Sequence, residues 1–135
     1  MTEPSPIQLI RSETLAPGVL YAYAAVAHDV RRLVFTAGAC PLDDTGATVD
    51  GDVAAQADVV MQNLRTALRA AGADLSDVVK TTVYVASSRS ADLVAAWDVV
   101  RDHFGDHDAP STLLGVAALG YPGQLVEVEA IAALR

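Results

Sequence analysis

The stretch that most constrains the fold is the C-terminal segment, residues 109–134, which is apolar, rich in β-forming residues and interrupted once. Two strand-like runs, Ser111–Leu119 and Leu125–Ala132, flank a Gly-Tyr-Pro-Gly segment at positions 120–123. Glycine and proline there are typical of a turn, because they adopt or fix backbone angles that tight turns require. The segment therefore predicts a closing β-hairpin.

Two glutamates lie within the second of these runs. Because side chains alternate between the two faces of a strand, Glu127 and Glu129 share one face, and the valines beside them face the other way. The sequence has no Lys or Arg between Arg101 and Arg135. Carboxylates on an apolar strand cost free energy unless polar partners satisfy them. We therefore expect partners from elsewhere in the fold or from another subunit, and we expect function at this strand.

Length and charge limit the classes of protein to consider. With 135 residues, the chain fits a single domain, residues 1–135. A net charge of −8 repels phosphate backbones, so nucleic acid is not an expected partner. The sequence has neither an apolar run long enough to span a membrane nor a signal-peptide pattern. Its single cysteine permits no internal disulfide, which fits a reducing compartment, so we expect a cytoplasmic protein. Because no long apolar run is present, we expect no contact with membranes.

Hydrophobic periodicity predicts the remaining elements. Residues 1–18 contain three prolines and are expected to form an extended arm. Apolar residues at three- and four-residue steps indicate one helix capped by Asp52 and ending at Gly72, and a second from Ser90 to Gly105. The other expected strands are Tyr21–Val26 and Leu33–Ala39, joined as a hairpin through residues 28–32, and Val78–Ala86.

The resulting order, β-β-α-β-α-β-β, indicates an α+β fold with two helices on one face of a mostly antiparallel sheet. The opposite face then lacks cover. Because the closing strands are too apolar to leave a whole sheet face in water, we expect the chain to form an oligomer through that face.

Several short segments, taken together and in order, carry a more specific signal than periodicity does. They are Thr36-Ala37-Gly38 followed by Pro41-Leu42, Asp52–Ala57, Asn63-Leu64, Ala70-Ala71-Gly72, Asp77–Val85 and Val126–Ala132. In these segments the chain resembles the Rid/YjgF family, the reactive intermediate deaminases. The resemblance implies a YjgF-like, chorismate-mutase-like fold and a homotrimer with three clefts between subunits. It also implies hydrolysis of enamines or imines of small metabolites to a carbonyl compound and ammonia, with neither a metal nor a cofactor.

The resemblance also implies roles for individual residues. Glu127 matches the glutamate that positions the attacking water in the family, and backbone groups of Ala37 and Gly38 match the loop that contacts substrate. An alternative is that Glu127 only accepts hydrogen bonds across the subunit seam. Glu129 is interpreted as structural, paired with Lys80 or with an arginine of a neighbouring subunit.

Two aromatic residues are further candidates for substrate binding. Tyr23 approximately matches a tyrosine of the family cleft, with Tyr21 as the alternative. Trp97 falls where many members carry an asparagine. Because Trp97 also lies on the apolar face of its helix, core packing is the competing interpretation.

The chain departs from the family pattern at the start of the penultimate strand. Deaminases of the family carry an arginine there, just before a Ser or Thr, and it grips the substrate carboxylate. Here the positions are Pro110, Ser111 and Thr112, so Ser111 and Thr112 remain substrate-binding candidates without the cation. Deamination of 2-imino acids is therefore doubtful, unless an arginine such as Arg11 or Arg31 of a neighbouring subunit replaces the clamp.

Two further sets of residues could in principle supply a nucleophile or metal ligands, but their context indicates neither. Cys40 follows an apolar strand and is expected to behave as a small hydrophobic residue rather than as a nucleophile. His103 and His107 alternate with Asp106 and Asp108, but their spacing matches no zinc pattern, so a solvated acidic loop is expected rather than a metal site.

These observations favour an enzyme: a cofactor-free hydrolase (deaminase) or tautomerase acting on an enamine- or imine-like metabolite, with Glu127 as general base or water holder. The alternative is a non-catalytic trimer of the same fold that binds a small molecule. A ribonuclease is a third hypothesis, which the acidic charge disfavours.

Overall fold

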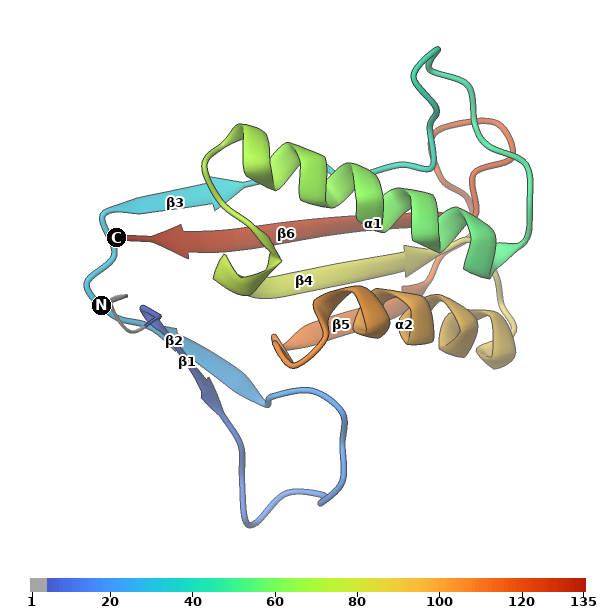
Figure 1. Ribbon diagram of the computed structural model, residues 1–135. Helices are drawn as coiled ribbons and strands as arrows, with labels where there is room; N and C mark the ends of the chain where they lie inside the picture. Colours follow the sequence, from blue (N-terminus) through green and yellow to red (C-terminus); the bar gives the residue numbers. More distant parts are fainter. Residues whose placement is uncertain (1–4) are drawn as a thin grey trace.

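The fold is built on a four-stranded sheet whose two helices lie on the same face, as Figure 1 shows. A computed structural model describes residues 5–135. The elements in chain order are β1 (Ile7–Ile10), β2 (Ala24–Ala27), β3 (Arg32–Phe35), α1 (Val53–Ala70), a short 3-10 helix η1 (Leu75–Asp77), β4 (Val78–Val85), α2 (Ser90–Phe104), β5 (Ser111–Gly115) and β6 (Val126–Leu134). The sheet order is β3-β6-β4-β5, and only the β4–β5 pair is parallel. The predicted α+β class with a mostly antiparallel sheet is therefore confirmed.

Helix α1 begins and ends where its capping chemistry predicts. The Asp52 side chain accepts a hydrogen bond from the Ala55 backbone N–H, which satisfies one of the free donors of the first turn. At the other end Gly72 adopts φ +85°, a value that favours glycine at the position after a helix. Seven residues of the helix, spaced mostly by three or four, are buried against the sheet: Val53, Gln56, Ala57, Val60, Met61, Leu64 and Leu68.

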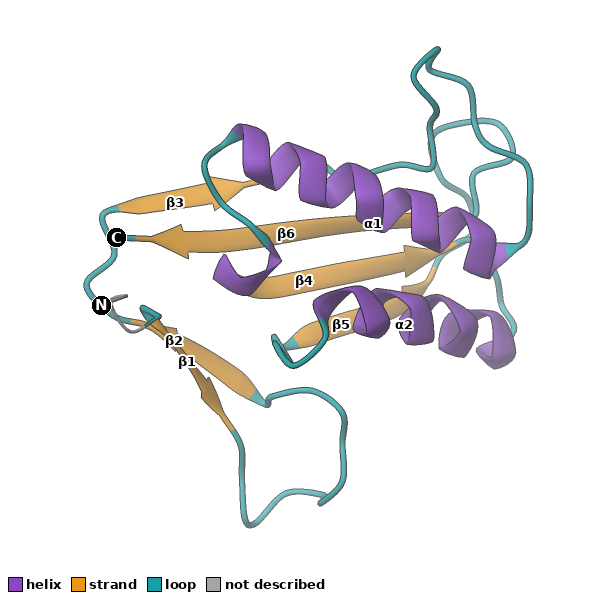
Figure 2. Ribbon diagram, in the orientation of Figure 1, coloured by secondary structure: helices purple, strands orange, loops and turns teal. Residues whose placement is uncertain are grey.

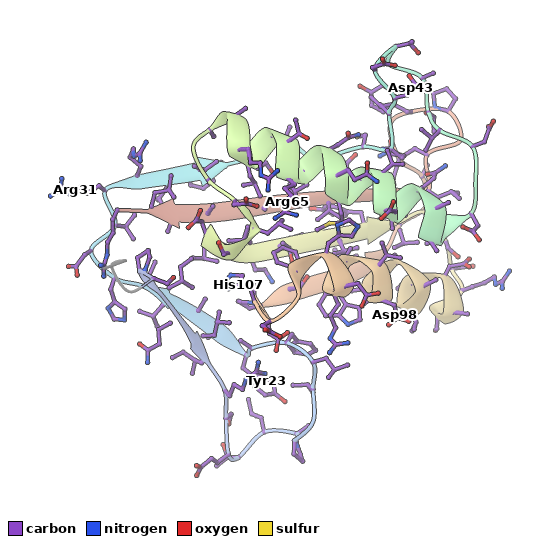
Figure 3. All side chains as sticks on the ribbon, in the orientation of Figure 1. Tyr23, Arg31, Asp43, Arg65, Asp98 and His107 are labelled. Atoms are coloured by element: carbon purple, nitrogen blue, oxygen red, sulfur yellow. The ribbon has the colours of Figure 1, made fainter. Side chains whose placement is uncertain are left out.

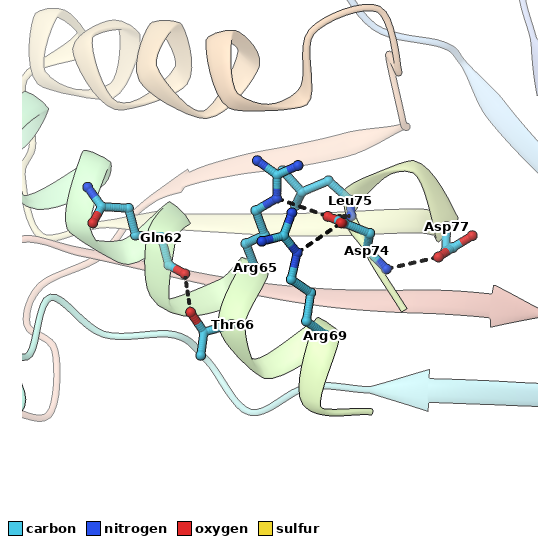
Figure 4. A network of polar contacts seen from close by, with 7 residues as sticks. All are labelled: Gln62, Arg65, Thr66, Arg69, Asp74, Leu75 and Asp77. Carbon is cyan, nitrogen blue, oxygen red and sulfur yellow. Dashed lines mark hydrogen bonds and ion pairs between the residues drawn. The ribbon is translucent and has the colours of Figure 1, made fainter. Parts of the chain in front are cut away.

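The turn from α1 into β4 is fixed by an ionic network (Figure 4). Asp74 accepts hydrogen bonds from Arg65 and Arg69 of the helix, both at 3.0 Å. Asp74 and Asp77 also form a reciprocal capping box at η1. Side chains thus hold α1 to the segment that leads into β4.

The predicted closing hairpin is wrong, although its two strands exist. Strand β5 pairs in parallel with β4, and β6 pairs antiparallel with β4, so β4 lies between the two strands that were expected to be neighbours. A parallel pair needs a long crossover connection, and α2 provides it between β4 and β5. The turn around Gly120 therefore belongs to a longer connection that crosses the end of β4.

The predicted first hairpin and the N-terminal arm also need correction. Residues 7–10 of the expected arm form β1, which pairs antiparallel with β2 in a separate two-stranded sheet. Figure 2 shows this sheet splayed away from the main one. The strands expected at Tyr21–Val26 and Leu33–Ala39 are shorter, Ala24–Ala27 and Arg32–Phe35, and they lie in different sheets. The first four residues of the expected arm lie outside the described part.

The face of the main sheet opposite the helices is uncovered within the chain. Three large apolar side chains of its strands are strongly exposed: Leu33 at 55%, Phe35 at 69% and Leu114 at 42%. Exposed apolar side chains gathered on one sheet face favour burial against another subunit. Neither helix of the described residues is long and apolar enough to cross a membrane.

A candidate site around Glu127

Strand β6 presents its glutamates on the uncovered face. Val126, Val128 and Ala130 are buried toward the helices, whereas Glu127 and Glu129 are only partly buried on the other side. This alternation is the one that the sequence predicts. Because β6 lies between β3 and β4, its side chains are flanked by residues of both neighbouring strands.

The Glu127 carboxylate has two neutral hydrogen-bond donors on the same oxygen. The Cys40 thiol donates to Oε1 at 3.2 Å, and the Gln124 side-chain amide donates to Oε1 at 3.1 Å. Neither partner was identified from the sequence, because both lie in irregular segments whose conformation periodicity does not predict. Among residues 5–135, no Lys or Arg forms an ion pair with this carboxylate.

Gly38 lies directly against the same carboxylate. A Cβ added at Gly38 would lie 2.2 Å from Oε2, 2.5 Å from Cδ and 2.7 Å from Cγ of Glu127, so only glycine fits beside this side chain. The antiparallel backbone bridge between Ala39 and Val128, with the Ala39 N–H donating at 2.7 Å, holds the loop alongside β6. The predicted loop of Ala37 and Gly38 is therefore adjacent to Glu127 within one chain.

Cys40 is a neutral thiol in these surroundings. Burial, together with the hydrogen bond to Glu127 and its negative charge, raises the pKa of Cys40 from 9.0 to about 11. A thiol with so high a pKa is a poor nucleophile at neutral pH, because the thiolate is the reactive form. Cys40 therefore acts as a hydrogen-bond donor, which differs from the simple hydrophobic role expected from sequence.

Glu129 has a partner other than the predicted cation. The Tyr84 hydroxyl of β4 donates to Glu129 Oε1 at 2.7 Å, and this hydrogen bond raises the pKa of Tyr84, with burial adding to the effect. Lys80, the expected partner within the chain, instead donates to Thr112 Oγ1 at 2.6 Å. Glu129 and Lys80 do line one depression of about 180 Å³ on the uncovered face, together with Phe35.

The other predicted substrate contacts lie away from Glu127 in the single chain. Tyr23 donates from its hydroxyl to the Ala16 carbonyl at 2.7 Å, beside the small sheet in Figure 3. Tyr21 lies between Tyr23 and Trp97, with ring centroids 5.9 and 6.2 Å apart in edge-to-face geometry. The Ser111 hydroxyl accepts a hydrogen bond from buried Thr81, on the helix side of β5. None of these groups hydrogen-bonds to the Glu127 carboxylate within residues 5–135.

Sequence reasoning missed Arg101, which follows Trp97 by one turn on α2. Its Nε is buried, and no residue within 5–135 supplies it with a hydrogen-bond partner. Arg101 lines a small hollow with Leu20, Trp97 and Asp108, but Asp108 pairs with Arg11 instead. The i, i+4 spacing from Trp97 is the signal that could have placed this arginine beside the predicted site.

The histidines of the 103–108 segment have structural partners. His103 Nε2 lies 2.7 Å from the Asp58 carboxylate of α1, and His107 Nε2 lies 2.7 Å from the Val78 carbonyl. Figure 3 shows His107 near the start of β5. The part of the chain that the structure describes contains no group of three or more His, Cys, Asp or Glu residues arranged to hold a metal ion.

Comparison with known proteins places this geometry in a family. The family described as Endoribonuclease L-PSP matches residues 13–134. A RutC family protein of Pyrococcus abyssi is 36% identical over 104 residues, covering 76% of this chain and 80% of the relative. Human 2-iminobutanoate/2-iminopropanoate deaminase is 32% identical over 129 residues, covering 95% and 91%.

Solved structures agree with the sequence relatives. The crystal structure of YyfB from Yersinia pestis, described as a protein of unknown function of the conserved Rid family, superposes with a TM-score of 0.85 at 33% identity, covering 96% of this chain and 99% of that one. A Thermotoga maritima structure described as a putative endoribonuclease gives a TM-score of 0.69 at 30% identity, covering 98% and 95%. The chain therefore belongs to the Rid/YjgF family, whose profile is the one described as Endoribonuclease L-PSP.

Proposed function

We propose that this chain forms a homotrimer that hydrolyses an enamine- or imine-like small metabolite, or tautomerises it, in clefts between subunits. The observation that carries the proposal is the Glu127 carboxylate on the uncovered sheet face, with Oε1 held by two donors and Oε2 lying over Gly38. The exposed Leu33, Phe35 and Leu114 support assembly through that same face.

The proposed chemistry needs one carboxylate and one water. A water held by Glu127 attacks the C=N carbon as one of its protons passes to the carboxylate and the electron pair of the C=N π bond moves to nitrogen. Glu127 delivers that proton to the nitrogen, which gives a neutral carbinolamine. Glu127 then takes the hydroxyl proton of the carbinolamine and passes it to the nitrogen as the C–N bond breaks and the C=O bond forms, so the products are a carbonyl compound and ammonia. In the tautomerase variant, Glu127 moves a proton between carbon and nitrogen without water attack.

The preferred substrate is proposed to carry no carboxylate at the position that related deaminases grip. Pro110 supplies no cation there, and Lys80 on the same face is engaged with Thr112. Loss of a charge-assisted hydrogen bond costs about 1.5–3 kcal/mol, or roughly 10- to 150-fold in kcat/KM. The relatives named 2-iminobutanoate/2-iminopropanoate deaminase thus suggest the reaction type better than the substrate.

The second candidate is a trimer that binds a small molecule without turning it over. The absence of a cation at Pro110 favours this hypothesis, because it removes a group that would orient a substrate for attack. Turnover separates the two candidates, since a binding protein slows the spontaneous hydrolysis of an imine or leaves it unchanged.

The test measures ammonia release from imines that an amino-acid oxidase generates in situ, and from neutral N-unsubstituted imines made in solution. Wild-type protein is expected to accelerate hydrolysis of the neutral imines, and Glu127→Gln to reduce the enzymatic rate by about 10²–10⁴-fold. Glu129→Gln is the matched control, since it changes the next glutamate of the same face. Equal rates with and without wild-type protein across all these imines would favour the binding hypothesis.

A further inference from the structure

The two neutral donors to Glu127, Cys40 and Gln124, have no role in the proposed reaction steps. Gln124 is 4% exposed, and each polar group of its amide is used. Its oxygen accepts from the Tyr121 N–H at 3.1 Å, and its nitrogen donates to the Val126 carbonyl and to Glu127 Oε1, both at 3.1 Å. A flipped amide would place its oxygen against two acceptors, so this network fixes its orientation.

Cys40 has one proton and two acceptors within reach. The Gly38 carbonyl lies 3.4 Å from Sγ, and Glu127 Oε1 lies 3.2 Å away. A carboxylate is the stronger acceptor, because hydrogen bonds to a charged group are stronger than those to a neutral one. The pKa of about 11 keeps the thiol protonated at neutral pH, so it remains a donor.

The two oxygens of Glu127 are therefore unequal. Oε1 accepts both neutral donors, whereas no residue within 5–135 donates a hydrogen bond to Oε2. Two other titratable groups lie near on the same face, Tyr84 on β4 and Glu129 on β6, but they bind each other rather than Glu127.

We propose that Cys40 and Gln124 are positioning residues, which together hold Oε1 of Glu127 so that Oε2 is the oxygen presented to the ligand. This inference rests on the proposed function for its catalytic consequence, but the contacts can be tested without turnover. Two neutral donors stabilise the ionised carboxylate while adding no charge to the cleft, and they prevent rotation of the carboxylate. The donors thus set which oxygen meets the water.

The first arm of the test uses the single cysteine as its own probe. The absorbance near 240 nm of each protein, minus that of the same protein carrying Cys40→Ser, reports the Cys40 thiolate, because the chain has no other cysteine and its four tyrosines contribute equally to both members of the pair. Wild-type protein is expected to titrate near pH 11, Glu127→Gln at lower pH because the negative charge is gone, and Gln124→Leu at higher pH because the amide lowers the pKa of Cys40. Gln62→Leu, which removes an exposed amide bound to Asp58, is the matched control and is expected to leave the titration unchanged.

The second arm uses the neutral imines. Cys40→Ala is expected to lower kcat about tenfold with little change in KM. Cys40→Ser keeps an O–H donor and is expected to recover most of kcat. A Cys40→Ala variant that had only lost stability would instead show full kcat per folded molecule at temperatures well below its melting temperature.

The experiments distinguish a failure of the positioning inference from a failure of the proposed function. If no imine is turned over but the thiol titrations move in the two expected directions, the proposed reaction is wrong and the positioning contacts stand. Titration of wild-type Cys40 near pH 9, unchanged in both Glu127→Gln and Gln124→Leu, overturns the inference. If imines are turned over, full kcat in Cys40→Ala also overturns it.

Discussion

Gly38→Ala is the most direct structural perturbation of the Glu127 site. The new Cβ would lie 2.2 Å from Oε2 and 2.7 Å from Cγ of Glu127. Rotation of the carboxylate alone cannot relieve the Cγ contact, so the whole Glu127 side chain must swing away from Cys40 and Gln124. Overpacking typically costs about 1–3 kcal/mol.

The size of the effect follows from the contacts that this movement breaks. The loss of two hydrogen bonds to a carboxylate adds to the packing cost, but the displaced carboxylate regains water on the uncovered face. We therefore expect a total of about 2–3 kcal/mol, near the upper part of the overpacking range. With an unfolding entropy of about 2.1 cal/mol/K per residue over 135 residues, this lowers Tm by about 7–11 °C.

The assay is thermal unfolding at one fixed protein concentration, with Gly120→Ala as the control. A Cβ at Gly120 would meet nothing within 4 Å, so that variant should melt within about 2 °C of wild type. In a Glu127→Ala background the clashing atoms are absent, and the cost of Gly38→Ala should fall below about 1 kcal/mol. A cost that is the same in both backgrounds would show that Gly38 and Glu127 are not in contact as described.

Four further predictions test other parts of the account. Light scattering should give about three times the chain mass of 14.0 kDa, and a monomer at micromolar concentration would remove the proposed cleft between subunits. Alkylation of Cys40 by iodoacetamide at pH 7.5 should be about 100-fold slower than in the unfolded chain, because raising the pKa from 9.0 to about 11 reduces the thiolate fraction at every pH below 9; equal rates would contradict the burial of the thiol beside Glu127. Pro110→Arg should raise kcat/KM for 2-iminobutanoate by about tenfold or more, measured as ammonia release, and no gain would mean that this position does not face the substrate. Arg101→Met should raise the free energy of unfolding by about 1 kcal/mol, because the buried Nε has no partner within residues 5–135; a loss of stability in urea titration would indicate that another subunit or a ligand pairs with this arginine.

The helices were predictable because their end signals are local. Asp52 caps α1, and Gly72 and Gly105 end α1 and α2, as their chemistry indicates. The strands were predictable as strands, but their partners were not. Periodicity identifies which residues of β5 and β6 face inward, and it contains no information about the insertion of β4 between them.

The small sheet shows a different limit of the sequence argument. The prolines of the N-terminal region led us to expect an extended arm, yet Ile7–Ile10 forms β1. Four residues are too few for an alternating pattern to be distinguished from an arm by composition alone. Its pairing with β2 is non-local, so only the three-dimensional structure reveals it.

The candidate site was predictable only where its residues lie in regular strands. Strand alternation placed Glu127 on the face away from the helices, and the resemblance to the family identified Gly38 as part of a substrate-contacting loop, although not as a neighbour of Glu127. The partners Cys40 and Gln124 were not predictable, because both lie outside the regular strands and their orientation depends on loop conformation. Arg101 was overlooked because an arginine on an amphipathic helix is ordinarily solvated.

The central claim is that Oε2 of Glu127 is the atom that meets the ligand, and a crystal structure of the assembled protein with a bound carbonyl product tests it most directly. Acetone and 2-oxobutanoate, soaked separately, represent the products of a neutral imine and of a 2-imino acid. We expect a trimer in which a water beside the carbonyl carbon lies about 2.6–3.2 Å from Oε2, while Oε1 keeps its contacts with Cys40 and Gln124. A Glu127 side chain sealed between subunits with no room for a ligand, or both products bound elsewhere, would contradict the account.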